Sequence, residues 1–238
     1  MNTKKNIRCV LVFDVETTGL LPKKIEETTP LTDLPYVIQL SYVIFETSNW
    51  RVSKEFNHYI HISPDIEIAP RITELTGITR EKCNSGIPME KALAEFCEDY
   101  VRCDMIVAHN ISFDRRMIQL EIKRHANILL PFYVENVFTP YFEKEESKQN
   151  YCTMYKSKHL CKLERKNEKG ETYIKSPKLS ELYEYLFETK APLHLHDSLV
   201  DTYVCLRCFV KMRFKFDIAA RGYKSEIFIM NQTPLCKL

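Results

Sequence analysis

The order of hydrophobic and polar positions along the chain predicts strands at the start and an alternation of helices and strands afterwards. Short apolar or alternating runs predict strands at residues 8–15, 36–46, 50–62 and 105–108. Apolar positions three and four apart predict helices at 70–76 (closed by Gly77), 87–101, 113–125, 179–187 and 198–212. This pattern predicts an α/β fold, with a mixed central sheet that begins as a β-meander and is flanked by helices.

Two segments interrupt this pattern. Residues 20–35 contain three prolines and several polar residues, and predict a long loop. Residues 141–178 hold ten Lys or Arg and six Glu, a net charge of +4 in a chain whose total is +2. Because five tyrosine or phenylalanine residues are interleaved with these charges, the segment is either a solvated loop or a surface for phosphates and bases.

Composition narrows the class of protein. The 238 residues are 45% hydrophobic and 28% charged, which excludes a disordered chain. The longest apolar run has five residues, whereas a membrane span needs about 20. Nine cysteines without framework spacing, behind no secretory signal, predict free thiols in an intracellular, reducing compartment. The Cys205-Leu206-Arg207-Cys208 motif is interpreted as two ordinary helix cysteines, with metal or redox use as the alternative.

The strand at residues 8–15 leads into two acidic residues, Asp14 and Glu16. Residues two apart on a strand point to the same face, so their carboxylates project together. Ionised carboxylates in a buried strand cost several kcal/mol or more unless they are paired or bind a cation. Their place at the C-terminal end of the strand, where α/β sheets bind ligands, favours a shared divalent cation over two solvated acids.

A second acid follows another predicted strand. His109 and Asn110 come directly after residues 105–108, and Asp114 lies in the first turn of the helix behind them. Taken alone, Asp114 could simply interact with the helix dipole.

The third group surrounds the start of the last predicted helix. That helix is apolar nearly all round, so Asp201 is an acid in a buried surface. His196 precedes the first turn and can reach the same place from a loop, with His194 as a weaker candidate. Asp197 is better explained as an N-cap than as a ligand.

Four acids from three segments and one histidine form a coherent set. Oxygen ligands suit Mg²⁺ or Mn²⁺, two such ions can clamp the oxygens of a phosphodiester displacement, and a histidine can deprotonate water.

These residues resemble the motifs of DnaQ-like 3′–5′ exonucleases of the DEDDh subgroup, which have the ribonuclease H-like fold. The matching segments are Phe13-Asp14-Val15-Glu16-Thr17-Thr18-Gly19-Leu20, Gly77-Ile78-Thr79, His109-Asn110 with Asp114, and His196 with Asp201. The resemblance implies that Asp14, Glu16, Asp114 and Asp201 hold two Mg²⁺ or Mn²⁺ ions, with His196 as general base. It further implies that the enzyme releases nucleoside 5′-monophosphates from a 3′ end.

The resemblance also implies substrate contacts and an organisation of domains. Thr17, Thr18, Gly19 and Leu20 would meet the terminal nucleotide, with His109 and Asn110 nearby and Phe113 as a further stacking surface. An exonuclease domain would cover residues 7–212, with a basic insertion at 141–178 and a C-terminal extension at 213–238 that packs on it. The segments around Tyr151-Cys152-Thr153-Met154 and Pro177-Lys178-Leu179 resemble those of stand-alone exonucleases from phages and large DNA viruses.

Several alternatives remain open at this level. Single-stranded or frayed DNA is the favoured substrate, and an exoribonuclease of the same family is the alternative. A non-catalytic nucleic-acid-binding module would be expected to lack one of the five site residues, and all five are present. A polymerase or replication partner could dock on the C-terminal extension, and the protein could be a monomer or a homodimer.

Overall fold

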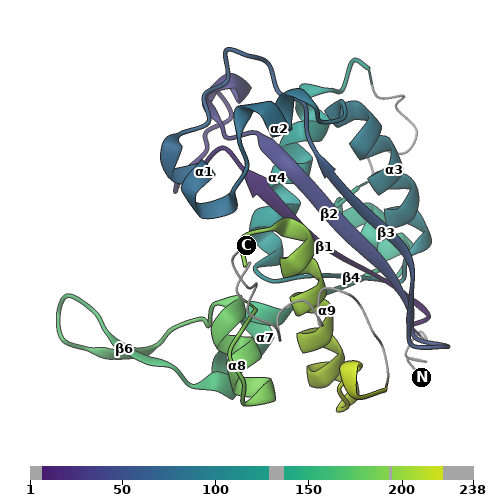
Figure 1. Ribbon diagram of the computed structural model, residues 1–238, viewed down its shortest axis with the longest axis vertical. Helices are drawn as coiled ribbons and strands as arrows, with labels where there is room; N and C mark the ends of the chain where they lie inside the picture. Colours follow the sequence, from purple (N-terminus) through teal and green to yellow (C-terminus); the bar gives the residue numbers. More distant parts are fainter. Residues whose placement is uncertain (1–6, 129–136, 193–194, 222–238) are drawn as a thin grey trace, which may run out of the picture.

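The computed structural model describes residues 7–128, 137–192 and 195–221. A twisted sheet runs diagonally through the molecule, with helices on both faces and a hairpin that projects from the body (Figure 1). The strands are β1 Cys9–Thr17, β2 Val37–Glu46, β3 Arg51–Tyr59, β4 Met105–Ala108, β5 Gln149–Cys152, β6 Glu164–Lys166 and β7 Thr172–Ile174. The helices are α1 Pro70–Thr76, α2 Arg80–Asn84, α3 Met89–Arg102, α4 Ile111–Arg124, α6 Pro140–Glu145, α7 Thr153–Cys161, α8 Leu179–Phe187 and α9 Ser198–Phe214, with short 3₁₀ turns at Leu31–Asp33 and Ala219–Arg221.

The central sheet has the strand order β3-β2-β1-β4-β5. The first three strands pair antiparallel as the predicted meander, whereas β1 with β4 and β4 with β5 pair parallel. The sheet is therefore mixed, as predicted, and β1 occupies its middle. The carboxyl ends of β1 and β4 share one edge, which is where ligands bind in sheets of this kind.

The alternation of side chains along β1 divides the core into two layers. Leu11, Phe13 and Val15 face α3 and α4 in one hydrophobic cluster. Val10 and Val12 face α8 and α9 in the other. Since side chains two apart share a face, Asp14 and Glu16 project from β1 toward α9.

The predicted loop at residues 20–35 contains only the 3₁₀ turn among regular elements. Residues 141–178, for which a solvated loop was one of two interpretations, instead contain several regular elements. They include β5, which completes the edge of the central sheet, together with α7 and the β6–β7 hairpin. Helix α7 buries Thr153, Ser157 and Cys161, three small residues spaced four apart. An apolar periodicity could not reveal this helix, because the buried stripe is made of a hydroxyl, a hydroxyl and a thiol.

The end of α9 and the residues that follow it pack on the domain. Phe214 and Phe216 place their rings 5.0 and 4.5 Å from the indole of Trp50, and Ile218 is buried. The rest of the extension predicted to pack on the domain, residues 222–238, lies outside the described residues.

The eight cysteines in the described ranges are free thiols, and Cys205 and Cys208 are buried in α9. Within the same ranges, no helix is long and apolar enough to cross a membrane.

Candidate active site

The first two acids of the site come from the end of β1. Asp14 lies opposite Ser41 of β2, and Glu16 lies opposite Gln39, so both are inside the sheet and not in the loop beyond it. The Ser198 hydroxyl donates a hydrogen bond of 2.6 Å to the main-chain oxygen of Asp14. This bond joins the first strand directly to the first residue of α9.

The third acid, Asp114, comes from the first turn of α4. Its side chain is 3% exposed, and its Oδ1 accepts a hydrogen bond of 3.3 Å from the Val15 amide. Because Val15 lies between Asp14 and Glu16, this bond holds Asp114 beside the two acids of β1. The structure thus brings together segments about 100 residues apart, as the sequence predicted.

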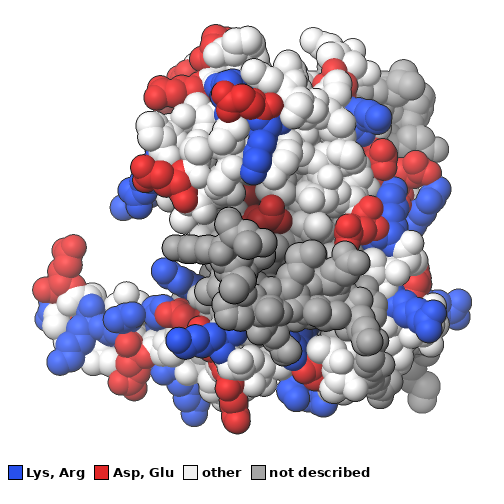
Figure 2. Space-filling view, in the orientation of Figure 1, with Lys and Arg blue, Asp and Glu red and all other residues white. Residues whose placement is uncertain are grey.

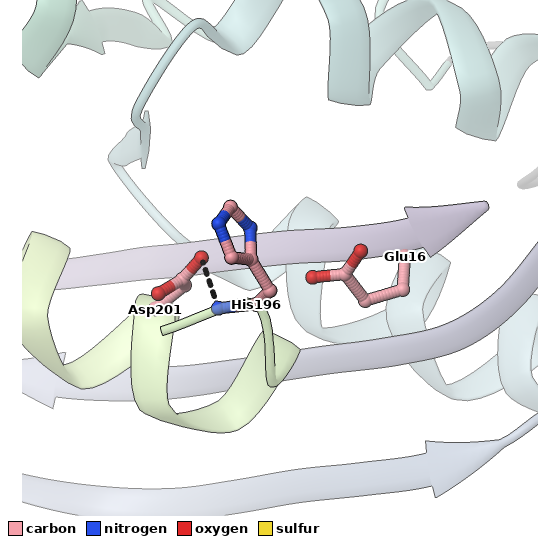
Figure 3. Close-up of side chains that lie close together, drawn as sticks. All are labelled: Glu16, His196 and Asp201. Atoms are coloured by element: carbon pink, nitrogen blue, oxygen red, sulfur yellow. Dashed lines mark hydrogen bonds between the residues drawn. The ribbon is translucent and has the colours of Figure 1, made fainter. Parts of the chain in front are cut away.

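The last acid and the histidine come from the start of α9. The Oδ2 of Asp201 accepts a hydrogen bond of 3.4 Å from the His196 amide, while its buried Oδ1 has no hydrogen-bond partner within the described chain. One ligand atom each from Glu16, His196 and Asp201 lie within 4.8 Å of one another. Figure 3 shows the imidazole of His196 between the two carboxylates.

The electrostatics of these acids are unfavourable without a cation. Burial, and then the neighbouring acids Asp114, Asp201 and Glu16, hold the pKa of Asp14 well above its usual range. Burial and the same cluster raise the pKa of Glu16 to about 8. Burial also raises the pKa of Asp114 to about 8 and that of Asp201 to about 7.

This donor set fits a divalent cation. The residues supply carboxylate oxygens, which Mg²⁺ and Mn²⁺ prefer, and the buried Oδ1 of Asp201 is available as a ligand. A bound cation would also favour the charged form of every acid in the cluster.

The conformation of His196 is unusual. Its φ is 80°, in the left-handed region that non-glycine residues rarely adopt, at a cost of about 1–3 kcal/mol. Its side chain is exposed, and burial and then the positive charge of Lys178 lower its pKa below 6.5. The imidazole is therefore neutral at pH 7 and can accept a proton. His194, the weaker candidate, lies outside the described residues.

Asp197 is a helix cap, as predicted. Its Oδ1 accepts hydrogen bonds from the amides of Leu199 and Val200 at 3.0 and 3.2 Å. This cap fixes the start of α9 between His196 and Asp201.

A group of polar side chains that the sequence analysis did not select supports this cap from β2. Gln39, which is 1% exposed, donates to Asp197 Oδ2 at 3.4 Å and accepts from the Ser198 amide at 3.3 Å. Asn57 of β3 accepts hydrogen bonds from Gln39 and from Ser41. Gln39 and Ser41 are polar residues two apart in an apolar strand, the same signal that identified Asp14 and Glu16.

His109 makes structural contacts with both ring nitrogens. Nδ1 lies 2.9 Å from the hydroxyl of Thr153, and Nε2 lies 3.1 Å from the main-chain oxygen of Pro177. Burial lowers the pKa of His109 to about 4, so the ring is neutral, and it connects the end of β4 to α7 and to the segment before α8. The structure gives His109 this role, whereas a contact with substrate stays a prediction.

The other predicted substrate residues differ in their surroundings. Asn110 adopts a φ of 69° at the start of α4, and its side chain accepts a hydrogen bond from Ser112. Phe113 is half-buried and packs against the first hydrophobic cluster, so at most part of its ring could meet a base.

The turn after β1 lines a pocket. Thr17 donates its hydroxyl hydrogen to the Gly19 carbonyl, and Thr18 exchanges two hydrogen bonds of 2.9 Å with Tyr36. Leu20 is 87% exposed. The pocket, of about 420 Å³, is lined by Thr18, Gly19, Leu20, Leu34, Tyr36 and neighbours from the loops around them.

Arg124 of α4 holds the C-terminal end of the loop at residues 20–35. Its guanidinium donates to the main-chain oxygens of Leu31, Leu34 and Pro35 at 2.7–2.9 Å. It also pairs with the buried carboxylate of Glu121 at 2.7 Å. The long loop at residues 20–35 is thereby fixed in place beside the site.

A family model and several known proteins match this chain in sequence. The family model RNase_T, described as exonuclease, matches residues 11–209. A DNA polymerase III PolC-type from Streptococcus sanguinis (strain SK36) is 31% identical over 153 residues, which cover 64% of this chain and 9% of the relative. A 3′–5′ exonuclease DinG from Bacillus subtilis (strain 168) is 34% identical over 121 residues, covering 51% of this chain and 11% of the relative. The matched segment thus spans about a tenth of the length of these relatives.

Solved structures show the same fold. The nuclease domain of 3′hExo, a DEDDh family member bound to rAMP, has a TM-score of 0.59 at 13% identity, covering 91% of this chain and 96% of that one. Exonuclease I of E. coli in complex with a dA16 oligonucleotide has a TM-score of 0.58 at 15% identity, covering 96% of this chain and 46% of that one. The predicted ribonuclease H-like fold is confirmed. Since the family model spans most of the sequence, the chain belongs to the RNase_T exonuclease family, the DnaQ-like DEDDh group that its motifs resemble.

Proposed function

We propose that this protein is a metal-dependent 3′–5′ exonuclease that hydrolyses phosphodiester bonds at DNA 3′ ends and releases nucleoside 5′-monophosphates. The observation that carries the proposal is the convergence of four carboxylates and one neutral imidazole from β1, α4 and the start of α9. Membership in an exonuclease family supports it, as does the relative named 3′–5′ exonuclease DinG.

In this proposal, Asp14, Glu16, Asp114 and Asp201 hold two Mg²⁺ or Mn²⁺ ions. When bound, such ions supply positive charge that stabilises the attacking and leaving oxygens of a phosphodiester displacement. The protein contributes a fixed cluster of acids, because the Val15 amide holds Asp114 and the His196 amide holds Asp201.

His196 acts as the general base. Its ring is exposed and neutral, so its free nitrogen can take a proton from the attacking water. The backbone of His196 is held by Asp201, and the helix that follows is held by the Asp197 cap. In this arrangement the ring lies between the carboxylates of Asp201 and Glu16 (Figure 3).

The pocket beside Thr18, Gly19 and Leu20 receives the terminal nucleotide. A pocket of about 420 Å³ lies within the usual size range of small-ligand sites. Main-chain groups of the turn meet the sugar, and the exposed side chain of Leu20 packs on the base. Phe113 and Asn110 border the same region in this proposal.

The exonuclease domain extends over residues 7–212, and we propose that the C-terminal extension, residues 213–238, docks a polymerase or replication partner. Residues up to 218 are part of the packed structure, since Asp217 pairs with Arg207 at 2.7 Å and Ile218 is buried. A truncation after Arg221 is therefore the correct test in a pull-down. Loss of a captured polymerase on truncation would support this docking site, and unchanged capture would refute it.

The test of the function is an end-labelled degradation assay with Mg²⁺, Mn²⁺ or EDTA. Single-stranded DNA, RNA and a duplex with a mismatched 3′ end are compared, with Asp14→Asn as the inactive control and Glu74→Gln as a matched exposed-acid control. Stepwise loss from the DNA 3′ end that stops with EDTA supports the proposal. Faster loss of RNA would assign an exoribonuclease, and no degradation by folded protein with metal would refute the function.

A further inference from the structure

One charged surface lies outside the site described so far. Residues 153–178, here called the basic arm, comprise α7, the β6–β7 hairpin and the chain up to the start of α8. They carry eight Lys or Arg and three Glu, a net charge of +5, so the rest of the chain is at −3. The hairpin projects from the body at the lower left of Figure 1, and Figure 2 shows blue side chains on it together with red ones.

The hairpin has little role in the core of the domain. Strands β6 and β7 form a separate two-stranded sheet, whose three paired positions are all exposed or half-buried. Such a hairpin is marginally stable by itself. Core packing therefore does not explain why the hairpin carries long basic and aromatic side chains.

One face of the hairpin presents a cation and an aromatic ring side by side. Arg165 lies directly opposite Tyr173 in the strand register, and Tyr173 is 49% exposed. Within the described ranges, neither side chain has a hydrogen-bond, ion-pair or ring partner. Of the three Glu of the arm, Glu164 points to the opposite face and Glu171 accepts a hydrogen bond from Asn167. The third, Glu168, lies in the turn between the two strands.

The arm joins the body next to the active site. Its last residue, Lys178, lies close enough to His196 to act on it electrostatically, and Pro177 is bonded to His109 at the end of β4. Tyr173 and Lys178 are five positions apart, which is a distance of at most about 18 Å in an extended chain. A stacked nucleic-acid strand rises about 3.4 Å per nucleotide, so this distance corresponds to about five nucleotides.

We propose that the basic arm binds the single-stranded part of the substrate, up to about five nucleotides on the 5′ side of the bond that is cut. This inference rests on the proposed function, because an enzyme that cuts at the 3′ end leaves the remaining strand on the 5′ side. Arg165 contacts a backbone phosphate, and Tyr173 stacks on a base. An exposed ring favours single strands, whose bases are free to stack, and this contact is tolerant of sequence.

The test compares a long substrate with a minimal one. Wild-type protein, Tyr173→Ala, Tyr173→Phe and Arg165→Ala are assayed on dT12 and on the p-nitrophenyl ester of thymidine 5′-monophosphate, which has no 5′ strand. Lys91→Ala is the matched control, since Lys91 is an exposed lysine on α3, away from the hairpin.

Tyr173→Ala is expected to raise KM for dT12 about tenfold with kcat unchanged, and to leave the minimal substrate unaffected. Tyr173→Phe keeps the stacking ring and should behave as wild type. Arg165→Ala should reduce the salt dependence of KM for dT12, by about 0.7 in the slope of the logarithmic plot, because one phosphate contact is lost.

Two results would refute strand binding by the basic arm while leaving the proposed function intact. The first is that Tyr173→Ala and Arg165→Ala match Lys91→Ala on dT12, and the second is an equal loss on both substrates. If the wild type cuts neither substrate, the proposed function fails. Fluorescence anisotropy of 5′-labelled dT12 then tests whether the arm binds a single strand. Tenfold weaker binding by Tyr173→Ala would then support the arm, and equal binding would overturn it.

Discussion

Replacing Asp201 by asparagine should stabilise the metal-free protein at pH 8 while it abolishes hydrolysis. The side chain is half-buried in α9, its Oδ1 has no hydrogen-bond partner within the described chain, and other acids surround it. An asparagine keeps the acceptor for the His196 amide, replaces the unpaired oxygen by an NH₂ donor and removes one negative charge.

The magnitude follows from the pKa of Asp201. Burial, and then the neighbouring Asp197, raise this pKa from 3.8 to about 7. A group whose pKa is raised in the folded state contributes its full stability below the unfolded pKa and loses it as the pH rises through the folded pKa. At about 1.4 kcal/mol per unit, the advantage of Asp201→Asn should be small at pH 4 and reach on the order of 2–4 kcal/mol at pH 8.

Urea unfolding of both proteins in EDTA, from pH 4 to pH 8, measures this difference. Glu74→Gln, which neutralises an exposed acid on α1, is the matched control and should show no such pH dependence. Added Mg²⁺ should stabilise the wild type by about 2.7 kcal/mol at 100 times its Kd, and stabilise the variant less. An Asp201→Asn protein that is no more stable than wild type at pH 8 in EDTA would refute the reasoning, and so would equal stabilisation of both by Mg²⁺.

The other predictions concern the base, its neighbour and two supporting side chains. His196→Ala should lower kcat by about 10²–10⁴ with KM little changed, and an unchanged rate in a steady-state assay would move the base elsewhere. Lys178→Gln should shift the acid limb of the pH–rate profile to higher pH, because removing this positive charge raises the pKa of His196. An acid limb at the same pH as in the wild type would contradict His196 as the general base. Gln39→Leu removes two contacts to the start of α9 and should lower kcat about tenfold, whereas full activity would show that this support is dispensable. Arg124→Ala leaves the buried Glu121 without its cation and should lower the free energy of unfolding, measured in urea, by about 3–5 kcal/mol. A decrease of less than about 1 kcal/mol would contradict this prediction.

Local signals in the sequence were sufficient to predict most strands of the central sheet and to select the acids of the site. The helices at Pro70–Thr76 and Leu179–Phe187 and the strand at Met105–Ala108 have the predicted bounds, because each has a clear apolar pattern and a clear end. The acids at Asp14, Glu16 and Asp201 stood out because charged residues interrupted apolar patterns. That they meet at one place was observed in the structure, and their roles in catalysis stay predictions.

The elements that were missed lack such patterns. Strand β5 has four residues, and it is defined by its parallel pairing with β4, which only the folded chain provides. The strand that contains Gln39 was predicted, but Gln39 itself was not selected, since an uncharged polar residue contrasts less with apolar neighbours than a carboxylate does. Its importance comes from Asp197 and Ser198, which are nearly 160 residues away in the sequence.

The packing of α9 against β1 has a consequence for synthesis of the chain. A protein is made from its N-terminus, and the hydrogen bond between Ser198 and Asp14 joins residues 184 positions apart, so this contact forms late. Until Ser198 and Asp201 have been made, the sheet lacks the cover of one face and the acids of β1 lack their partner. A nascent or truncated chain that does not yet include His196 and α9 is therefore expected to be unable to cut nucleic acid, because two of the proposed site residues are still missing from it.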